Sequence, residues 1–221
     1  MAKYVTFSFD DGVEQDERFI GMLNEYGFKA TFNINTGIQS RANCWVNEGV
    51  EIHRMNIRGL KDLYAGHEVA AHTLTHPFLN KLDEDTIYNE IFYDVKNIEE
   101  IFGVLPVGLA YPYGAYDDRV IEIARNLGIK YARTAGTSMK FTVQPDLMRY
   151  AGTCHFSNPE IFRLIDDFET LPEKKERQVL FIWGHTYEFD VLKKWDFLKT
   201  LFERLKTVRA EFVTNREAFG V

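Results

Sequence analysis

The sequence predicts an α/β domain built around a parallel sheet of about seven strands. Short apolar or alternating segments, typical of strands, are separated by segments with apolar residues at helical spacing, and this alternation favours a parallel sheet. Such a sheet forms either a barrel or an open, doubly wound structure. A length of 221 residues, of which 45% are hydrophobic, suits one packed unit, so we expect residues 1–221 to form a single domain.

Strands are predicted where apolar residues alternate with polar ones or follow one another over about four to eight residues. In the first strand Val5, Phe7 and Phe9 share one face, and the continuous apolar run at 178–183 is expected to be buried on both faces. Residues 148–152 carry a weaker strand pattern. In chain order the predicted strands are residues 4–9, 30–34, 68–71, 107–110, 130–133, 178–183 and 211–213.

Helices are predicted between the strands, and several of them end at a glycine. Ser157–Glu160 is a further helix start, because Asn158 can cap a helix and Pro159 suits its first turn. Residues 35–57 follow neither pattern and are predicted as a long loop that could form one wall of a cleft. In chain order the predicted helices are residues 16–26, 58–65, 83–102, 117–127 and 191–206.

The composition limits the partners that this chain can have. The net charge is −7 and no long run of like charges occurs. We therefore expect neither nucleic acid nor a membrane as a partner, and we expect a neutral substrate. Cys44 and Cys154 are the only cysteines, and we expect free thiols. Because neither an export signal nor a membrane-spanning segment is recognisable, a cytoplasmic location is expected, or an extracellular one if the chain is a trimmed piece. The oligomeric state is not predicted.

Four of the predicted strands lead directly into polar, reactive side chains. Parallel α/β folds build their active sites at the carboxyl ends of their strands, so we expect these side chains to share one rim. For the first pair, an ordinary Asp-Gly turn is the competing interpretation. The residues are Asp10 and Asp11, His72 and His76, Tyr113, and His185.

These residues suit a metal-dependent hydrolase. His72 and His76 are spaced to reach one ion, and Asp11 as a third ligand gives an open site with positions for water and substrate. A zinc-like ion there would polarise a carbonyl and acidify a water, whose proton Asp10 could accept. His185 could donate a proton to the leaving group. In isolation, chance spacing of the first two histidines and a core role for His185 compete with this hypothesis.

Four segments, in this order along the chain, resemble the successive motifs of the polysaccharide deacetylase family, the nodulation-type (NodB) domain of carbohydrate esterase family 4. The resemblance implies a distorted or incomplete (β/α) barrel that hydrolyses acetyl groups from a carbohydrate. His67, in a Gly-His-Glu segment that also fits, would be a structural residue. The four segments are Ser8–Gly12, His72–His76, Tyr111–Gly114 and Leu180–His185.

The resemblance also implies a role for each site residue. Asp10 would be the base and His185 the acid, and the backbone N–H of Tyr113 would stabilise the oxyanion. The metal ligands would be Asp11, His72 and His76, and the cofactor a divalent ion, with zinc first and cobalt, nickel or manganese as alternatives. The substrate would be an acetylated oligosaccharide or polysaccharide, or a small acetylated sugar.

The sequence departs from the family pattern in two places. Many members carry an arginine that pairs with the catalytic aspartate at the position where this chain has Ala110. Arg133 and Arg149 are the candidates to replace it. The family's fourth motif, an Asp-Trp element that tunes the catalytic histidine, has no clear match. The carboxylates that could take over this function are Asp146, Glu188 and Asp190.

The remaining expectations concern a sugar-binding surface and two alternative functions. A sugar ring could bind to a platform formed by Tyr111, Tyr113, Trp45 and Tyr187, with Pro112 as a further substrate contact, although core packing competes as the role of the aromatic residues. A catalytically impaired carbohydrate-binding member of the same fold is the alternative function, because of the two departures. A phosphohydrolase with an aspartate nucleophile is disfavoured, since the expected Asp-x-Asp pattern is interrupted by Gly12.

Overall fold

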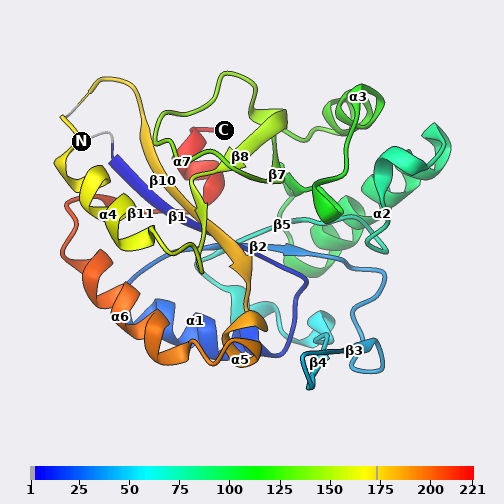
Figure 1. The fold of residues 1–221 in the computed structure, drawn as a ribbon. Coiled ribbons are helices and arrows are strands. Elements are labelled where there is room, and N and C mark those ends of the chain that lie inside the picture. Colours follow the sequence, from blue (N-terminus) through cyan, green and yellow to red (C-terminus); the bar gives the residue numbers. More distant parts are fainter. Residues whose placement is uncertain (1–2, 173) are drawn as a thin grey trace.

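The computed structural model describes residues 3–172 and 174–221, which form a parallel sheet surrounded by helices (Figure 1). Two further strands, β3 (Cys44–Asn47) and β4 (Val50–His53), form a separate antiparallel hairpin. The strands of the sheet in the described residues are β1 (Lys3–Asp10), β2 (Thr31–Ile34), β5 (Glu68–Ala71), β6 (Gly108–Ala110), β7 (Tyr131–Thr137), β8 (Tyr150–Gly152), β9 (Cys154–His155), β10 (Gln178–His185) and β11 (Glu211–Phe212).

The helices follow the strands in alternation. None of those described has the length and apolar content that a membrane-spanning segment needs. The α-helices are α1 (Gln15–Tyr26), α2 (Glu84–Phe102), α3 (Asp118–Asn126), α4 (Ile161–Thr170), α5 (Glu188–Val191), α6 (Trp195–Lys206) and α7 (Asn215–Phe219). Short 3-10 helices are η1 (Ile57–Gly59), η2 (Lys61–Tyr64), η3 (Leu79–Lys81), η4 (Pro112–Gly114) and η5 (Leu147–Arg149).

The sheet is an incomplete barrel, as predicted. Its strand order is β8-β7-β6-β5-β2-β1-β10-β9, with β11 paired to β1, and all of these pairs are parallel. The end strands β8 and β9 are not paired with each other in the described part of the chain, so the barrel stays open. The sheet has nine strands rather than about seven, because β8 carries only a weak pattern and β9, with two residues, is too short to give one.

Strand β1 has an apolar face and a polar face. Phe7 packs against Phe202 of α6 at 5.5 Å between ring centroids, and Phe9 packs against Phe189 of α5 at 5.9 Å, so this face is part of the main core. The intervening residues point to the opposite face, as the period of a strand requires. Strand β1 therefore presents its apolar face to the helices and its polar face to the inside of the barrel.

The inside of the barrel contains a buried polar network rather than a purely apolar core. Asn215, the first residue of α7, accepts a hydrogen bond from the Thr6 hydroxyl at 2.8 Å and donates one to Oγ of Ser8 at 3.1 Å. Ser8 also accepts one from Nδ2 of Asn33 at 2.9 Å, and Asn33 reaches Asp10. The inner face of β1 is thereby linked to the last helix. Helix α7 is absent from the sequence predictions because five residues show no clear period.

The prediction of a loop at residues 35–57 is wrong, because this segment contains the β3–β4 hairpin. Its two turn residues, Glu48 and Gly49, have φ of 48° and 83°, which is the backbone that tight hairpins need. The strands have only four residues each, so their alternation is too short to stand out. A hydrogen-bonded hairpin thus lies beside the carboxyl end of β1, where the sequence predicted a long loop.

Three helix predictions also need correction. Residues 58–65 form the 3-10 turns η1 and η2 rather than one helix. The helix predicted at 191–206 begins only at Trp195, as α6, because Val191 ends the short helix α5 and Lys193 lies between them in a left-handed conformation at φ 53°. Asn158 caps a turn instead of α4: its Oδ1 accepts a hydrogen bond from the N–H of Glu160, which precedes the helix. The other long helices are confirmed, and Cys44 and Cys154 are free thiols as expected.

Candidate active site

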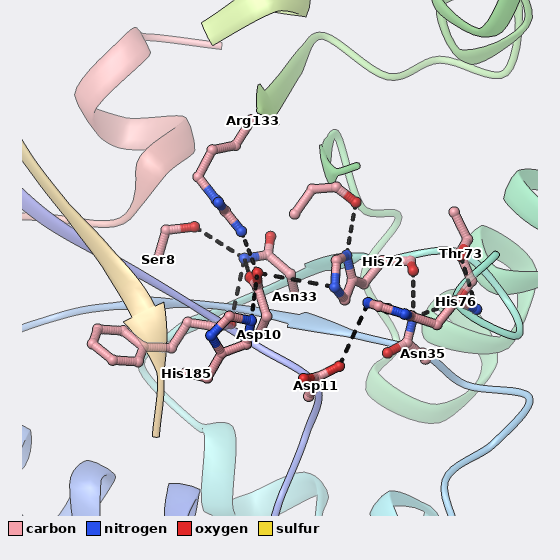
Figure 2. Close-up of polar contacts among 12 residues, drawn as sticks. Ser8, Asp10, Asp11, Asn33, Asn35, His72, Thr73, His76, Arg133 and His185 are labelled. Atoms are coloured by element: carbon pink, nitrogen blue, oxygen red, sulfur yellow. Dashed lines mark hydrogen bonds and ion pairs between the residues drawn. The ribbon is translucent and has the colours of Figure 1, made fainter. Parts of the chain in front are cut away.

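The functional side chains meet because neighbouring strands end at the same level. In the sheet register Asp10 pairs with Asn33 on β2 and with His185 on β10. Strand β5 ends directly before His72, and β7 carries Arg133. Figure 2 shows the other four side chains converging on the Asp10 carboxylate, with Asp11 and His76 beside them. The expectation that the strand-end residues share one rim is therefore met by the fold.

Asp10 lies at the centre of the group and is only 4% exposed. Its Oδ1 accepts a hydrogen bond of 2.8 Å from Asn33, and its Oδ2 pairs with Nη2 of Arg133. The Nε2 atoms of His72 and His185 lie 3.9 and 3.8 Å from Oδ2. Burial works against ionisation of this group, but the charges of Arg133, His72 and His185 outweigh it and lower the pKa of Asp10 to about 2. Asp10 is an oriented carboxylate at neutral pH.

Arg133 supplies the cation that is missing at Ala110, directly before the Tyr111–Gly114 segment. Ala110, where the family pattern has arginine, pairs in register with Arg133 on the neighbouring strand. The guanidinium therefore reaches Asp10 from one strand further along the sheet, and its side chain is only 3% exposed. The other candidate, Arg149, is wrong, because it is exposed and pairs with Asp146 at 2.5 Å on the surface.

Asp11 points away from this centre because its backbone is left-handed, with φ of 83°. Only few non-glycine residues adopt this conformation, and aspartate is among those that tolerate it. Its Oδ1 lies 3.1 Å from Nη2 of Arg54 and 3.8 Å from Nε2 of His76. Burial opposes its ionisation, but the charges of His185 and Arg54 outweigh burial and lower the pKa of Asp11. The two adjacent carboxylates thus have separate surroundings.

His72 and His76 come from a loop and not from a helical turn. Nδ1 of His72 donates a hydrogen bond to the carbonyl oxygen of Ala110 at 2.7 Å, which leaves its Nε2 as a free acceptor. Thr73 and His76 have φ of 67° and 63°, and these two left-handed residues turn the chain so that the two imidazoles face each other. Their ring centroids are 4.7 Å apart.

The donor set of Asp11, His72 and His76 fits a divalent metal ion. One ligand atom from each residue lies within 4.8 Å of the others. Nε2 of His72 is buried and, within residues 3–172 and 174–221, has no hydrogen-bond partner, which is costly unless a ligand binds there. Burial lowers the pKa of both imidazoles, in His76 to about 4, and the neutral form is the one that binds metals.

His185 is oriented by Glu188, which answers the question of the supporting carboxylate. Oε2 of Glu188 accepts hydrogen bonds from the backbone N–H of His185 at 2.9 Å and from its Nδ1 at 3.2 Å. The other two candidates are engaged elsewhere: Asp146 binds surface arginines, and Asp190 accepts from Trp195 at 2.6 Å. Because Nδ1 of His185 donates to Glu188, its Nε2 faces Asp10.

His185 is also surrounded by negative charge. Burial disfavours its cationic form, but the hydrogen bond to Glu188 and the carboxylates of Asp10 and Asp11 outweigh burial and raise the pKa of His185 to about 9. Burial opposes the ionisation of Glu188, but its hydrogen bonds with His155 and His185 outweigh burial and lower the pKa of Glu188, whose carboxylate stays ionised. At neutral pH the site therefore combines a carboxylate, Asp10, with a protonated imidazole, which is the pairing that acid–base hydrolysis uses.

Comparison with known proteins agrees with this geometry. Residues 1–132 match the family model described as polysaccharide deacetylase. The chain belongs to the polysaccharide deacetylase family. Over 124 residues it is 38% identical to chitin deacetylase 1 of Cryptococcus neoformans var. grubii, in an alignment that covers 55% of this chain and 23% of that protein. The chain thus spans about a quarter of the length of this curated relative.

Two solved structures share the fold of the family over nearly the whole chain. The chitin deacetylase of Colletotrichum lindemuthianum has a TM-score of 0.64 at 18% identity, covering 97% of this chain and 86% of that one. A family 4 acetyl xylan esterase of Clostridium thermocellum, solved with a cobalt ion, has a TM-score of 0.62 at 16% identity, covering 98% and 90%. At this level of identity the similarity supports the distorted barrel of the family and no more.

The predicted aromatic platform divides into two groups. Tyr111 is 3% exposed and donates its hydroxyl hydrogen bond to Met148 at 3.0 Å, and Pro112 is buried, so both belong to the core and not to a platform. Trp45 and Tyr187 are half-buried and meet edge to face with centroids 5.4 Å apart. The prediction of a sugar-binding role is therefore wrong for the first two residues and stays a prediction for the second two.

A second aromatic pair lies beside the candidate metal-binding residue His76. Tyr113 is 58% exposed and stacks on Phe78 with centroids 3.9 Å apart, and its ring lies 4.6 Å from that of His76. Its backbone is left-handed, with φ of 57°, and Gly114 follows with φ of 65°. This double reversal lies directly after the carboxyl end of β6, and it places the Tyr113 ring beside His76.

Three residues that shape the site are missing from the sequence predictions. Asn33 donates to Oδ1 of Asp10 and lies one residue before the end of β2, so a search of the residues at strand ends could have found it. Arg54 follows β4, and no rule could find it while the hairpin was unrecognised. His155 ends the two-residue strand β9 and binds Glu188, but so short a strand gives no pattern to extend.

Proposed function

We propose that this chain removes acetyl groups from a carbohydrate, as an N-acetyl amide or an O-acetyl ester, with the help of a divalent metal ion. The observation that carries the proposal is that two groups of residues lie together in one site. One is the ligand set of Asp11, His72 and His76, and the other is the acid–base pair of Asp10 and His185. The family to which the chain belongs makes an acetylated carbohydrate the first substrate to consider.

The ion would be held by Asp11, His72 and His76, two nitrogen donors and one oxygen donor that suit zinc first and also cobalt, nickel or manganese. When bound, such an ion supplies Lewis-acid chemistry, polarising the acetyl carbonyl and making a water easier to deprotonate. The hydrogen bond from His72 to the Ala110 carbonyl fixes the imidazole in the tautomer that a metal requires.

The remaining residues would move protons and stabilise charge. Asp10 is positioned to accept a proton from the attacking water, because Asn33 and Arg133 fix its carboxylate and hold it ionised. His185 would donate a proton from Nε2 to the departing amine or alkoxide. The backbone N–H of Tyr113, at the left-handed turn of the rim, would donate to the oxyanion.

Replacing Glu188 with Gln should move the loss of activity on the alkaline side to lower pH. His185 acts as an acid only while protonated, so activity is present below its pKa and is lost as the pH rises through it. Since Glu188 contributes to raising the pKa of His185 to about 9, its neutral analogue should lower that pKa, by about 1 unit or more. The pH profile of kcat measures the shift, and an unchanged alkaline limb would contradict the role of Glu188.

Trp45 and Tyr187 would bind a sugar ring beside the reacting acetyl group. Trp45 lies on the hairpin, packed between Tyr187 and the guanidinium of Arg54, which lies 5.1 Å from its ring. Replacing Trp45 with Ala should raise KM about fivefold, the effect of losing about 1 kcal/mol of aromatic contact. Val46→Ala is the matched control, because Val46 is exposed on the same strand and should change nothing. A KM unaffected by the loss of Trp45 would remove it from the sugar site.

The alternative, a binding protein without catalysis, depends on two apparent absences from the sequence. Arg133 now stands at Asp10, where the missing arginine was expected, and Glu188 supports His185 in place of the fourth motif. Neither absence leaves a gap in the acid–base machinery. A deacetylase is therefore the function that the geometry supports best.

Acetate release across a panel of acetylated sugars tests this proposal. The panel should contain chitin oligosaccharides, peptidoglycan fragments, acetylated xylan and small acetylated sugars, with the zinc-loaded chain as the enzyme. We expect release from at least one of them above a no-enzyme control. Measurable sugar binding without acetate release from any substrate would contradict the proposal and favour the binding protein.

A further inference from the structure

Glu188 is held by two histidines, of which only one belongs to the proposed acid–base pair. Its Oε2 accepts hydrogen bonds from Nδ1 and the backbone N–H of His185, and also a third from Nε2 of His155 at 3.0 Å. His155 ends β9, the outermost strand beside β10, and its side chain is 21% exposed. Two imidazoles from adjacent strands thus share one carboxylate oxygen.

The contacts of His155 define which of its nitrogens carries the proton. Its Nδ1 lies 3.3 Å from the backbone N–H of Ser157, which can only donate, and 2.8 Å from the hydroxyl of the same residue. Nδ1 must therefore accept, and a single proton resides on Nε2, where it is donated to Glu188. His155 is in this arrangement a neutral imidazole with a fixed tautomer.

The position of the His155 ring is fixed by its neighbours. It meets the Trp183 ring edge to face at 4.8 Å and packs against Phe156 at 4.7 Å. At Gly184 a Cβ atom would lie 3.1 Å from Nε2 of His155 and 2.5 Å from the Phe156 ring, so the absence of a side chain there lets both rings approach β10. The donor to Glu188 is therefore preorganised by packing.

We propose that His155 is a positioning residue of the deacetylase site, which holds Glu188 where that carboxylate orients His185. The inference rests on the proposed function. Glu188 is the first residue of the one-turn helix α5, and its side chain is 22% exposed. Its carboxylate can therefore turn toward solvent instead of toward His185. In the described residues, two of the three donors to Oε2 belong to His185, the residue being oriented, and the third belongs to His155. Removing it leaves the carboxylate free to rotate away.

Two variants separate the hydrogen bond from the packing. His155→Phe keeps a ring between Trp183 and Phe156 but has no donor, whereas His155→Gln can place an N–H near the position of Nε2. For the zinc-loaded chain we expect kcat of acetate release to fall about 10-fold in the Phe variant, with KM within about twofold, and to recover most of this loss in the Gln variant. Equal losses in both variants, or a change in KM alone, would overturn the proposal.

A double-mutant cycle tests whether His155 acts through Glu188. In a Glu188→Gln background, the further change His155→Phe should cost less than about twofold, because the carboxylate that His155 positions is already gone. The same 10-fold loss in both backgrounds would show an independent, structural effect and overturn the proposal. Thermal unfolding of each variant, followed by circular dichroism, identifies a variant that has lost its fold, and His155→Gln then carries the comparison.

Nitrogen-15 NMR of the histidine side chains gives a readout that does not depend on activity. In the zinc-loaded chain we expect His155 as the Nε2–H tautomer, and a Nδ1–H signal of His185 that persists in the Gln variant and broadens in the Phe variant. His155 as a cation or as the Nδ1–H tautomer would overturn the inference. Because these signals report the hydrogen bonds alone, they separate its failure from a failure of the proposed deacetylase function.

Discussion

Replacing Asp10 with Asn should lower kcat for acetate release by about 10²–10⁴-fold, the contribution of a general base. Asn has nearly the same shape but cannot accept a proton from water. Wild-type Asp10 has a pKa of about 2, so the ionised base is present throughout the neutral range, and the loss should be the same at every pH tested there. Metal content should be unchanged, since Asp10 lies outside the proposed ligand set.

The matched control is Asp16→Asn, a buried aspartate outside the reacting centre. Asp16 accepts hydrogen bonds from Thr186 at 2.5 Å and Tyr64 at 3.1 Å, and burial raises its pKa to about 7. An amide should therefore replace it with only a small change in kcat. Asp10→Asn with full activity would contradict the assigned mechanism, and an equal loss in both variants would assign the effect to burial of an amide.

Replacing Arg133 with Ala should be the most damaging single change to the site. Arg133 and Asp10 are 3% and 5% exposed, and removing one partner of a buried ion pair costs about 3–5 kcal/mol of folding free energy. Without the guanidinium, burial should raise the pKa of Asp10. Because the base must be ionised, activity is lost below that pKa, and the acid limb of the pH profile should move upward. We expect kcat at neutral pH to fall at least 10²-fold.

The register of β6 and β7 suggests a rescue. Ala110 lies opposite Arg133, at the position where many family members carry the arginine. The double variant Ala110→Arg with Arg133→Ala should therefore return the cation to Asp10 from the neighbouring strand, and we expect it to recover at least about tenfold in kcat. Ala110→Arg alone should be destabilised, because Ala110 is fully buried while Arg133 fills the space.

Unfolding by denaturant measures the loss of folding free energy, and the pH profile of kcat measures the change in the pKa of Asp10. Arg133→Lys is the useful control, since it keeps the charge but loses the planar fork. If the double variant is no more active or stable than Arg133→Ala, the guanidinium is not transferable between the strands. The claim that β7 has taken over the function of the missing arginine would then be wrong.

The sequence could predict the residues that follow long, regular strands. Alternation in β1 and the apolar run in β10 define strand ends, and the rule that parallel strands end at one rim then groups Asp10, His72 and His185. Local spacing is sufficient for this step because each of these side chains is the last residue of its own strand or directly follows it. The same reasoning predicted most of the long helices from their period.

The sequence could name Arg133 and Glu188 only as candidates among others, and Arg54 not at all, because the partners of the reacting groups depend on how the elements are placed beside one another. Arg133 reaches Asp10 through the pairing of β6 with β7, which no spacing in the sequence records. Arg54 depends on a hairpin of four-residue strands, and Glu188 depends on the break that starts α5 directly after β10. Sequence periodicity thus finds the reacting groups more readily than the groups that hold them in place.

Acetate release before and after metal removal is the most direct test of the central claim. The best substrate of the panel should be used with the zinc-loaded chain, then after dialysis against a chelator, and again after zinc or cobalt is returned, with His76→Ala as the variant that has lost a ligand. We expect activity, loss of activity and recovery for the wild-type chain, and no recovery for His76→Ala. Acetate release that survives complete metal removal would contradict this claim.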